Sequence, residues 1–386
     1  MSADFGTRLR ELLADSGSSL RATARALNYD VAYLSRVTNG RQRPSRQMAE
    51  ALDEFLQTDG EFVELVKPKA MRLPSDEPSA TISDITHMKS SAAYLLSHAD
   101  RYGADTVAPA AVQIWRTAQR KLDAGEVPER EQRGYLSAVS EAAEVAGWLL
   151  FDAGEREAAR QAFLESHILA RHAGDRSMQW FALDMLAMLD NECGRPGEAG
   201  RISEEVLSQG RIPPRVATLA LIRRGGARAR MGDRQRAMAD FDAARGGLEE
   251  SVSPRDPEWA WWVNYREFTG HSAHALLILG DAGAAIPKLH SALEVATPRG
   301  VMFYRVGLLH SYARAKAWSD AEEEIHQISA LLDTIRSGRN RLLLREALRV
   351  VERSPGVPAG LAALATYSIA AIGCGARSAE CRRDCK

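Results

Sequence analysis

The sequence predicts an all-α protein in which a small helical bundle precedes a solenoid of helical hairpins. Along most of the 386 residues, apolar side chains recur at intervals of three and four, and alanine and leucine are abundant. No convincing run of alternating β-branched residues interrupts this pattern. Similar helix pairs also recur behind a first compact segment at residues 1–65. We therefore expect two helical units of different kinds.

Four short helices are predicted in the first unit. The first has an apolar face and ends on a glycine, and the next three follow the helix-capping residues Ser19, Asp30 and Ser45. Gly40 and Pro44 end the third helix, because glycine reverses the chain easily and proline cannot continue a helix. The predicted helices are Phe5–Gly17, Leu20–Asn28 with Asn28 in a left-handed turn, Val31–Asn39, and a fourth that runs from the Ser45 cap through Leu56.

The third helix carries the side chains that we expect to read DNA. Leu34 and Val37 anchor it to the core, which places its other side chains on the exposed side or toward the helix start. In a helix-turn-helix, the N-terminal part of the recognition helix enters the major groove, and flanking polar residues bind phosphates. The expected base-reading residues are Val31, Ala32, Tyr33 and Arg36, and the expected phosphate contacts are Ser19, Arg21, Asn39, Arg41 and Arg43.

The distribution of charge agrees with this interpretation. Residues 1–46 hold eight arginines and four acids, a net charge of +4, whereas residues 47–66 hold six acids and no basic residue. The whole chain has a formal net charge of -1, so attraction to a polyanion must come from local clustering. The alternative is a small helical domain with a solvated basic loop.

The stretch LRATARALNYDVAYLSRVTNGRQRPS resembles the Xre/Cro/cI-type helix-turn-helix family, in the version common in actinobacterial regulators, over about residues 5–57. The resemblance implies sequence-specific binding to double-stranded DNA. It departs at Leu20, where the family often has a glutamine that contacts DNA. The matching positions are Ala24, Leu27, Leu34, Ser35, Arg36, Gly40, Arg41, Arg43, Pro44 and Ser45.

Residues 66–85 are predicted to be a linker, because they combine proline, serine and mixed charge without periodicity. Helical hairpins follow at residues 86–367, and four of them align on a glycine in the turn with an alanine five residues later. The pattern resembles tetratricopeptide repeats with irregular spacing. The aligned pairs are Gly154 with Ala159, Gly194 with Ala199, Gly232 with Ala237 and Gly280 with Ala285, and a fifth hairpin keeps Ala321 but has Lys316 in the place of the glycine.

A helix-turn-helix followed by such repeats resembles regulators of the Rap, NprR, PlcR and PrgX type. That resemblance implies a homodimer on an inverted-repeat operator, with an array that binds a peptide or small-molecule effector, as in quorum sensing. The first helix of each pair lines the inner face, where Asn191 could clamp a peptide backbone; a solvated mixed-charge face is the alternative. The candidate effector-binding residues are Glu144, Trp148, Asp184, Met188, Asn191, Arg230, His274, His310 and Arg314.

Two clusters outside these motifs leave alternatives open. Trp259, Trp261 and Trp262 lie in the longest interruption of the array, and they are expected to belong to the core or to form an exposed pocket or interface. Residues 368–386 are expected to be a flexible tail with reduced thiols, the alternative being a metal site. The cysteines in this tail are Cys374, Cys381 and Cys385.

Several function classes are not expected from the sequence. It contains no HExxH, GxxxxGK[ST], GxSxG or CxxC pattern, so we expect neither an enzyme nor a cofactor or metal. It has no apolar run of eighteen residues and its first residues lack a secretion-signal layout, so we expect a cytoplasmic protein without a membrane partner. The competing function is an adaptor whose array recruits a protein partner, with DNA binding secondary.

Overall fold

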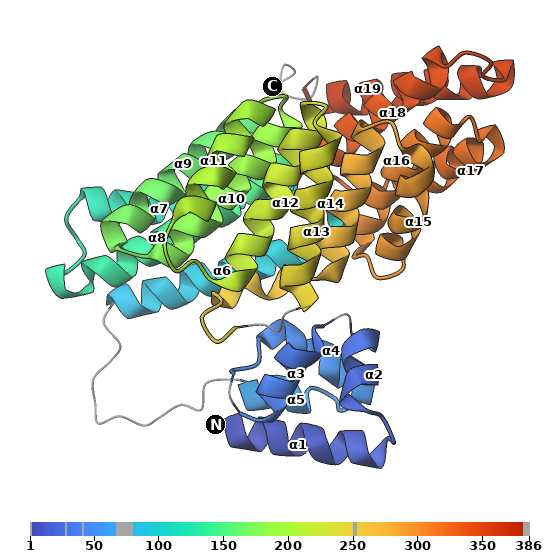
Figure 1. Ribbon diagram of the computed structural model, residues 1–386. Coiled ribbons are helices and arrows are strands. Elements are labelled where there is room, and N and C mark those ends of the chain that lie inside the picture. Colours follow the sequence, from blue (N-terminus) through green and yellow to red (C-terminus); the bar gives the residue numbers. More distant parts are fainter. Residues whose placement is uncertain (1, 28, 41, 67–79, 250–252, 381–386) are drawn as a thin grey trace.

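The chain is helical throughout the part that the structure describes. The computed structural model has helices joined by short turns, one 3-10 segment and no strand in this part, so the predicted all-α class is confirmed (Figure 1). The described residues are 2–27, 29–40, 42–66, 80–249 and 253–380.

Five helices near the N-terminus pack around a small apolar core. Phe5 of the first helix belongs to one cluster with Leu34 and Val37 of the third, and none of the three is more than 1% exposed. Gly6 allows the close approach of these helices, because a Cβ atom there would lie 2.2 Å from the carbonyl oxygen of Thr38. The helices are α1 (Ser2–Asp15), α2 (Leu20–Ala26), α3 (Val31–Thr38), α4 (Arg46–Leu56) and α5 (Glu61–Val66).

Side-chain caps begin α2, α3 and α4 at the predicted residues. Ser19, Asp30 and Ser45 each accept a hydrogen bond from a backbone amide two or three residues ahead, at 2.8–3.2 Å. Gly17 and Gly40 follow α1 and α3 with φ of +63° and +69°, a backbone that glycine adopts without a steric penalty. The predicted starts and stops of these helices are thus confirmed to within a few residues.

The fifth helix was not predicted. The carboxylate of Asp53 accepts hydrogen bonds from the backbone amides of Phe62 and Val63 at 2.8 and 2.9 Å, and so caps α5 from nine and ten residues away. Such a cap is not local in sequence, and the first unit is therefore one helix larger than expected. The left-handed turn expected at Asn28 lies outside the described residues.

Successive antiparallel helix pairs form the rest of the molecule, as the predicted solenoid requires (Figure 1). All four predicted turn glycines have a left-handed backbone, with φ between +75° and +89°, and Lys316 takes the same conformation in the fifth turn. The pairs are α8 (Glu129–Asp152) with α9 (Arg156–Ala173), α10 (Arg176–Glu192) with α11 (Pro196–Ser208), α12 (Pro214–Arg230) with α13 (Arg234–Glu249), α14 (Tyr265–Ile278) with α15 (Ala282–Leu293), and α16 (Pro298–Ala315) with α17 (Trp318–Ser329).

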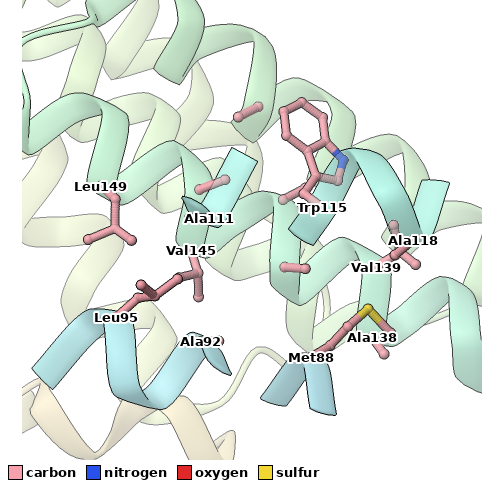
Figure 2. Close-up of a cluster of buried hydrophobic side chains, with 14 of the residues drawn as sticks. Met88, Ala92, Leu95, Ala111, Trp115, Ala118, Ala138, Val139, Val145 and Leu149 are labelled. Carbon is pink, nitrogen blue, oxygen red and sulfur yellow. The ribbon is translucent and has the colours of Figure 1, made fainter. Parts of the chain in front are cut away.

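Two helices precede the first pair and share a core with it. Figure 2 shows Leu95 of α6 (Ala80–Tyr102) and Trp115 of α7 (Ala108–Asp123) in the same apolar cluster as Val145 of α8. Because α5 ends at Val66 and α6 already begins at Ala80, residue 66 and residues 80–85 of the predicted linker 66–85 are helical.

The C-terminal part of the array returns to its beginning. The amide of Gly338, the first residue of α18 (Gly338–Arg353), donates a 2.8 Å hydrogen bond to Asp105, and the hydroxyl of Ser337 donates one of 3.0 Å to Asp152. A Cβ atom at position 338 would lie 2.0 Å from the carbonyl oxygen of Ala153, so the backbones are in direct contact. The solenoid therefore closes on itself instead of leaving its inner face open along its length.

The last helix extends beyond the predicted end of the array. Helix α19 (Ala359–Glu380) packs on α18 and continues past residue 367, so residues 368–380 are helical and the expected flexible tail is wrong for them. Leu361 and Ala365 of α19 are buried against α18. Cys381 and Cys385 lie outside the described residues, and the side chain of Cys374 is not described.

Candidate nucleic-acid interface

Helix α3 presents only some of the expected base-reading side chains to solvent. Val31 is 38% exposed, and Ala32 and Arg36 are partly buried. Tyr33 is only 6% exposed, which corrects its expected position on the exposed side. It lies four residues before Val37 and therefore shares the buried face of the helix.

The surroundings of Tyr33 explain its burial. Its ring stacks on that of Tyr29, with centroids 5.9 Å apart and planes 22° apart, and its side chain belongs to the apolar cluster of the N-terminal unit. Burial raises the pKa of Tyr33 above its ordinary value. This tyrosine thus supports the position of α3 from the buried face of the helix.

Arg36 is held by a residue that was not among the predicted site residues. Its Nε donates a 2.9 Å hydrogen bond to Oε1 of Gln42, in the loop between Gly40 and Pro44. Burial lowers the pKa of Arg36, while the charge of Asp30 raises it. Gln42 lies between the two arginines Arg41 and Arg43 in the sequence. Nothing in the sequence pattern indicated that it would bind Arg36.

Four of the five predicted phosphate-binding residues lie at the ends of α2 and α3 and are exposed. Ser19 and Arg21 stand at the start of α2, and Asn39 and Arg43 follow α3. The Asn39 amide also donates to the Ser35 hydroxyl at 3.3 Å. The predicted contact at Arg41 lies outside the described residues. The phosphate role of all five residues stays a prediction.

The repeat domain touches α3 at its N-terminal end. Arg215 of α12 is 3% exposed, and its guanidinium donates to Oδ2 of Asp30, the capping residue of α3, at 3.3 Å. The same guanidinium donates to the carbonyl of Val263, and the Arg215 amide donates to Asp256 at 2.9 Å. Figure 1 shows the N-terminal unit below the lower edge of the array, with α1 farthest from it.

A narrow pocket marks the boundary between the two units. Its lining from the N-terminal unit is Asp30, Tyr33 and Gln42, and its lining from the array includes Arg215 and Trp261. The remaining lining residues are Asp256, Pro257, Glu258 and Ala260.

The tryptophan-rich interruption divides between core and interface, so both readings left open by the sequence apply. The ring of Trp259 stacks on Phe181 with centroids 4.4 Å apart, and its Nε1 donates to the Ser177 hydroxyl at 3.0 Å. Trp262 packs beside the core of α12–α14, whereas Trp261 is 37% exposed and faces the boundary pocket. These residues form the 3-10 segment η1 (Glu258–Trp262).

Four of the nine candidate effector-binding residues are buried, and two of these four bind partners within the chain. Nε and Nη2 of Arg223 donate to the two carboxylate oxygens of Asp184 at 2.9 and 3.0 Å, and the Asn191 side-chain amide donates to the Arg223 carbonyl at 2.9 Å. Burial raises the pKa of Glu144, which is 3% exposed. Met188 is 6% exposed. These four predicted residues serve the packing of the array in this conformation.

The other candidates line the closed interior or its edge. Trp148 lies beneath the guanidinium groups of Arg299 and Arg339, 5.0 and 5.8 Å from its ring centroid. Arg230 lies 3.3 Å from His274, whose pKa burial lowers to about 3. Burial also lowers the pKa of His310 to about 4, and Arg314 is exposed. The structure thus does not gather the nine candidates into one open site.

Comparison with known proteins bears on the first unit. Residues 4–65 match the model of a family described as helix-turn-helix domain. No curated protein matches the chain. Among the described residues, no helix combines the length and apolar character needed to cross a membrane, and no group of three or more His, Cys, Asp and Glu side chains is placed to hold a metal. The helix-turn-helix match supports a DNA-binding regulator.

Proposed function

We propose that this protein is a sequence-specific transcriptional regulator that binds an inverted-repeat operator as a homodimer. The observation that carries the proposal is the capped helix α3, framed by the exposed groups of Arg21, Asn39 and Arg43 within a unit that matches a helix-turn-helix family. One such unit reads a single half-site, and a dimer doubles the contacts while matching the symmetry of a palindrome.

The repeat array is the proposed sensor of a peptide or small-molecule effector. The charged and histidine side chains in the interior of the array support this proposal. They bind one another, and they would have to exchange partners if a ligand entered. Arg230, which lies 3.3 Å from His274, and the histidines His274 and His310 are the basic side chains among the predicted effector-binding residues of this interior. A polar interior of this kind costs desolvation, and an anionic ligand would offset part of that cost.

Selection from a random pool of DNA duplexes tests the proposed function. We expect the full-length chain to enrich one inverted repeat, to protect both halves from cleavage, and to bind it less tightly as salt rises. If the bound duplexes have the same sequence distribution as the starting pool, sequence-specific regulation is wrong and the adaptor function replaces it.

A further inference from the structure

We propose that the repeat domain covers the DNA-reading end of α3 through Arg215, and that the chain binds its operator only after this contact opens. The inference rests on the proposed function, because it assumes that the N-terminal part of α3 enters the major groove. It concerns a separate question, namely whether this groove-reading end is accessible in the resting chain.

The first observation is the position of the buried guanidinium. Arg215 joins Asp30, at the start of α3, to the Val263 carbonyl behind η1, so one side chain ties both units together. A guanidinium that is 3% exposed needs its hydrogen-bond partners, because an unpaired buried charge is costly. The contact therefore has a free-energy reason to persist until another partner replaces it.

The second observation is the acidic character of the covering segment. Asp256 and Glu258 lie in the boundary pocket, and their charges act on Arg36 and Tyr33 respectively. Carboxylates from the array thus stand beside the helix where DNA would bring its phosphates. Because DNA must approach the same end of α3, the array and the operator exclude each other.

The third observation links this segment to the interior of the array. Trp259 of η1 lines a second small pocket together with Trp180, Asp184 and Arg223, while Trp261 of the same turn faces α3. Two residues of one short 3-10 turn thus contact the two regions. The segment that covers α3 thus also borders the buried Asp184–Arg223 pair.

Two substitutions open the contact from opposite sides. Arg215→Met removes the guanidinium and keeps an apolar stem of similar length. Asp30→Asn removes the charge but keeps a good helix-capping residue, so α3 retains its start and this variant keeps the test valid if Arg215→Met does not fold. Arg255→Ala removes an exposed arginine from the covering segment just before η1 and serves as the matched control.

The affinity of each full-length variant for one DNA duplex is measured by fluorescence anisotropy. This duplex carries the inverted repeat that selection enriches with wild type and also with Arg215→Met. We expect each single variant to bind about tenfold more tightly than wild type, the double variant to bind no more tightly than either, and Arg255→Ala to bind like wild type. If both variants open the same contact, their gains in affinity do not add in the double variant. A gain that comes only from losing the negative charge of Asp30 near DNA would instead multiply with the gain from Arg215→Met.

Hydrogen exchange without DNA gives an independent readout. We expect amides of α3 and of residues 253–263 to exchange faster in Arg215→Met than in Arg255→Ala. Equal exchange, unchanged affinity, or effects that multiply in the double variant would overturn the covering contact. If exchange rises but no variant binds any duplex, the proposed function fails although the two units are in contact. Tight binding that is insensitive to Arg215 instead overturns the covering contact and leaves the proposed function intact.

Discussion

The helix-turn-helix unit and the repeat array are built from the same kind of helix, yet they place their charged side chains differently. In the first unit, an apolar cluster fills the core, and Arg21 and Arg43 are exposed. In the array, Arg223 and Arg339 are buried with acidic partners. Exposed charge is available to a partner, whereas buried charge is committed to the architecture. The comparison explains why the predicted effector residues proved less accessible than the predicted phosphate contacts.

Removing a buried charge from the array is expected to have the largest effect on stability. Asp184→Ala leaves Arg223 with weaker partners in a buried site, and we expect the free energy of unfolding to fall by about 3 kcal/mol. Urea denaturation measures this loss. The matched control is Asp242→Ala, which breaks the exposed pair with Arg245 and should cost under about 1 kcal/mol. Equal losses would mean that burial does not distinguish the two pairs.

Closure of the array is tested by a single methyl group. Gly338→Ala places a Cβ atom against the Ala153 carbonyl, so we expect a loss of about 2 kcal/mol in the free energy of unfolding. Gly134→Ala, in α8 with open space around it, is the control and should be neutral or slightly stabilising. A neutral Gly338→Ala would show that the two ends of the array are not in contact.

Acid is expected to weaken the array through its buried histidines. Because the folded-state pKa of His310 is about 4, below the ordinary value of 6.5, the unfolded chain binds the proton first and stability falls as the pH drops below 6.5 toward 4. Between pH 7 and pH 5, His310→Gln should lose less stability than wild type by about 1.5 kcal/mol. Thermal unfolding at the two pH values measures the difference, and parallel losses in both proteins would contradict a buried neutral His310.

The smallest expected effects lie in the first unit and concern DNA. Arg36→Ala should relax sequence choice by about 1 kcal/mol per half-site, whereas Arg43→Ala should weaken binding to all sequences alike and reduce its salt dependence. Competition between the enriched repeat and a scrambled duplex separates the two. Equal losses of specific and non-specific binding in both variants would remove the distinction between base-reading and phosphate-binding residues.

Local features of the fold were predictable, and distant contacts were not. The caps at Ser19, Asp30 and Ser45 were recognisable because a side chain of the right type stands within three residues of the amide that it binds. The unpredicted α5 is capped by Asp53 from nine residues away. Burial of Tyr33 could have been found from its four-residue spacing to Val37, a signal that was present and overlooked.

By itself, the sequence determined the helical class, the helix starts and stops, and the left-handed turns of the hairpins, because capping and turn preferences act over a few residues. Only the tertiary structure decided that the solenoid closes and that Arg215 meets Asp30, 185 residues away. Those contacts depend on the crossing angles of many successive helix pairs, which add up along the array. No periodicity in the sequence shows which distant surfaces these angles bring together.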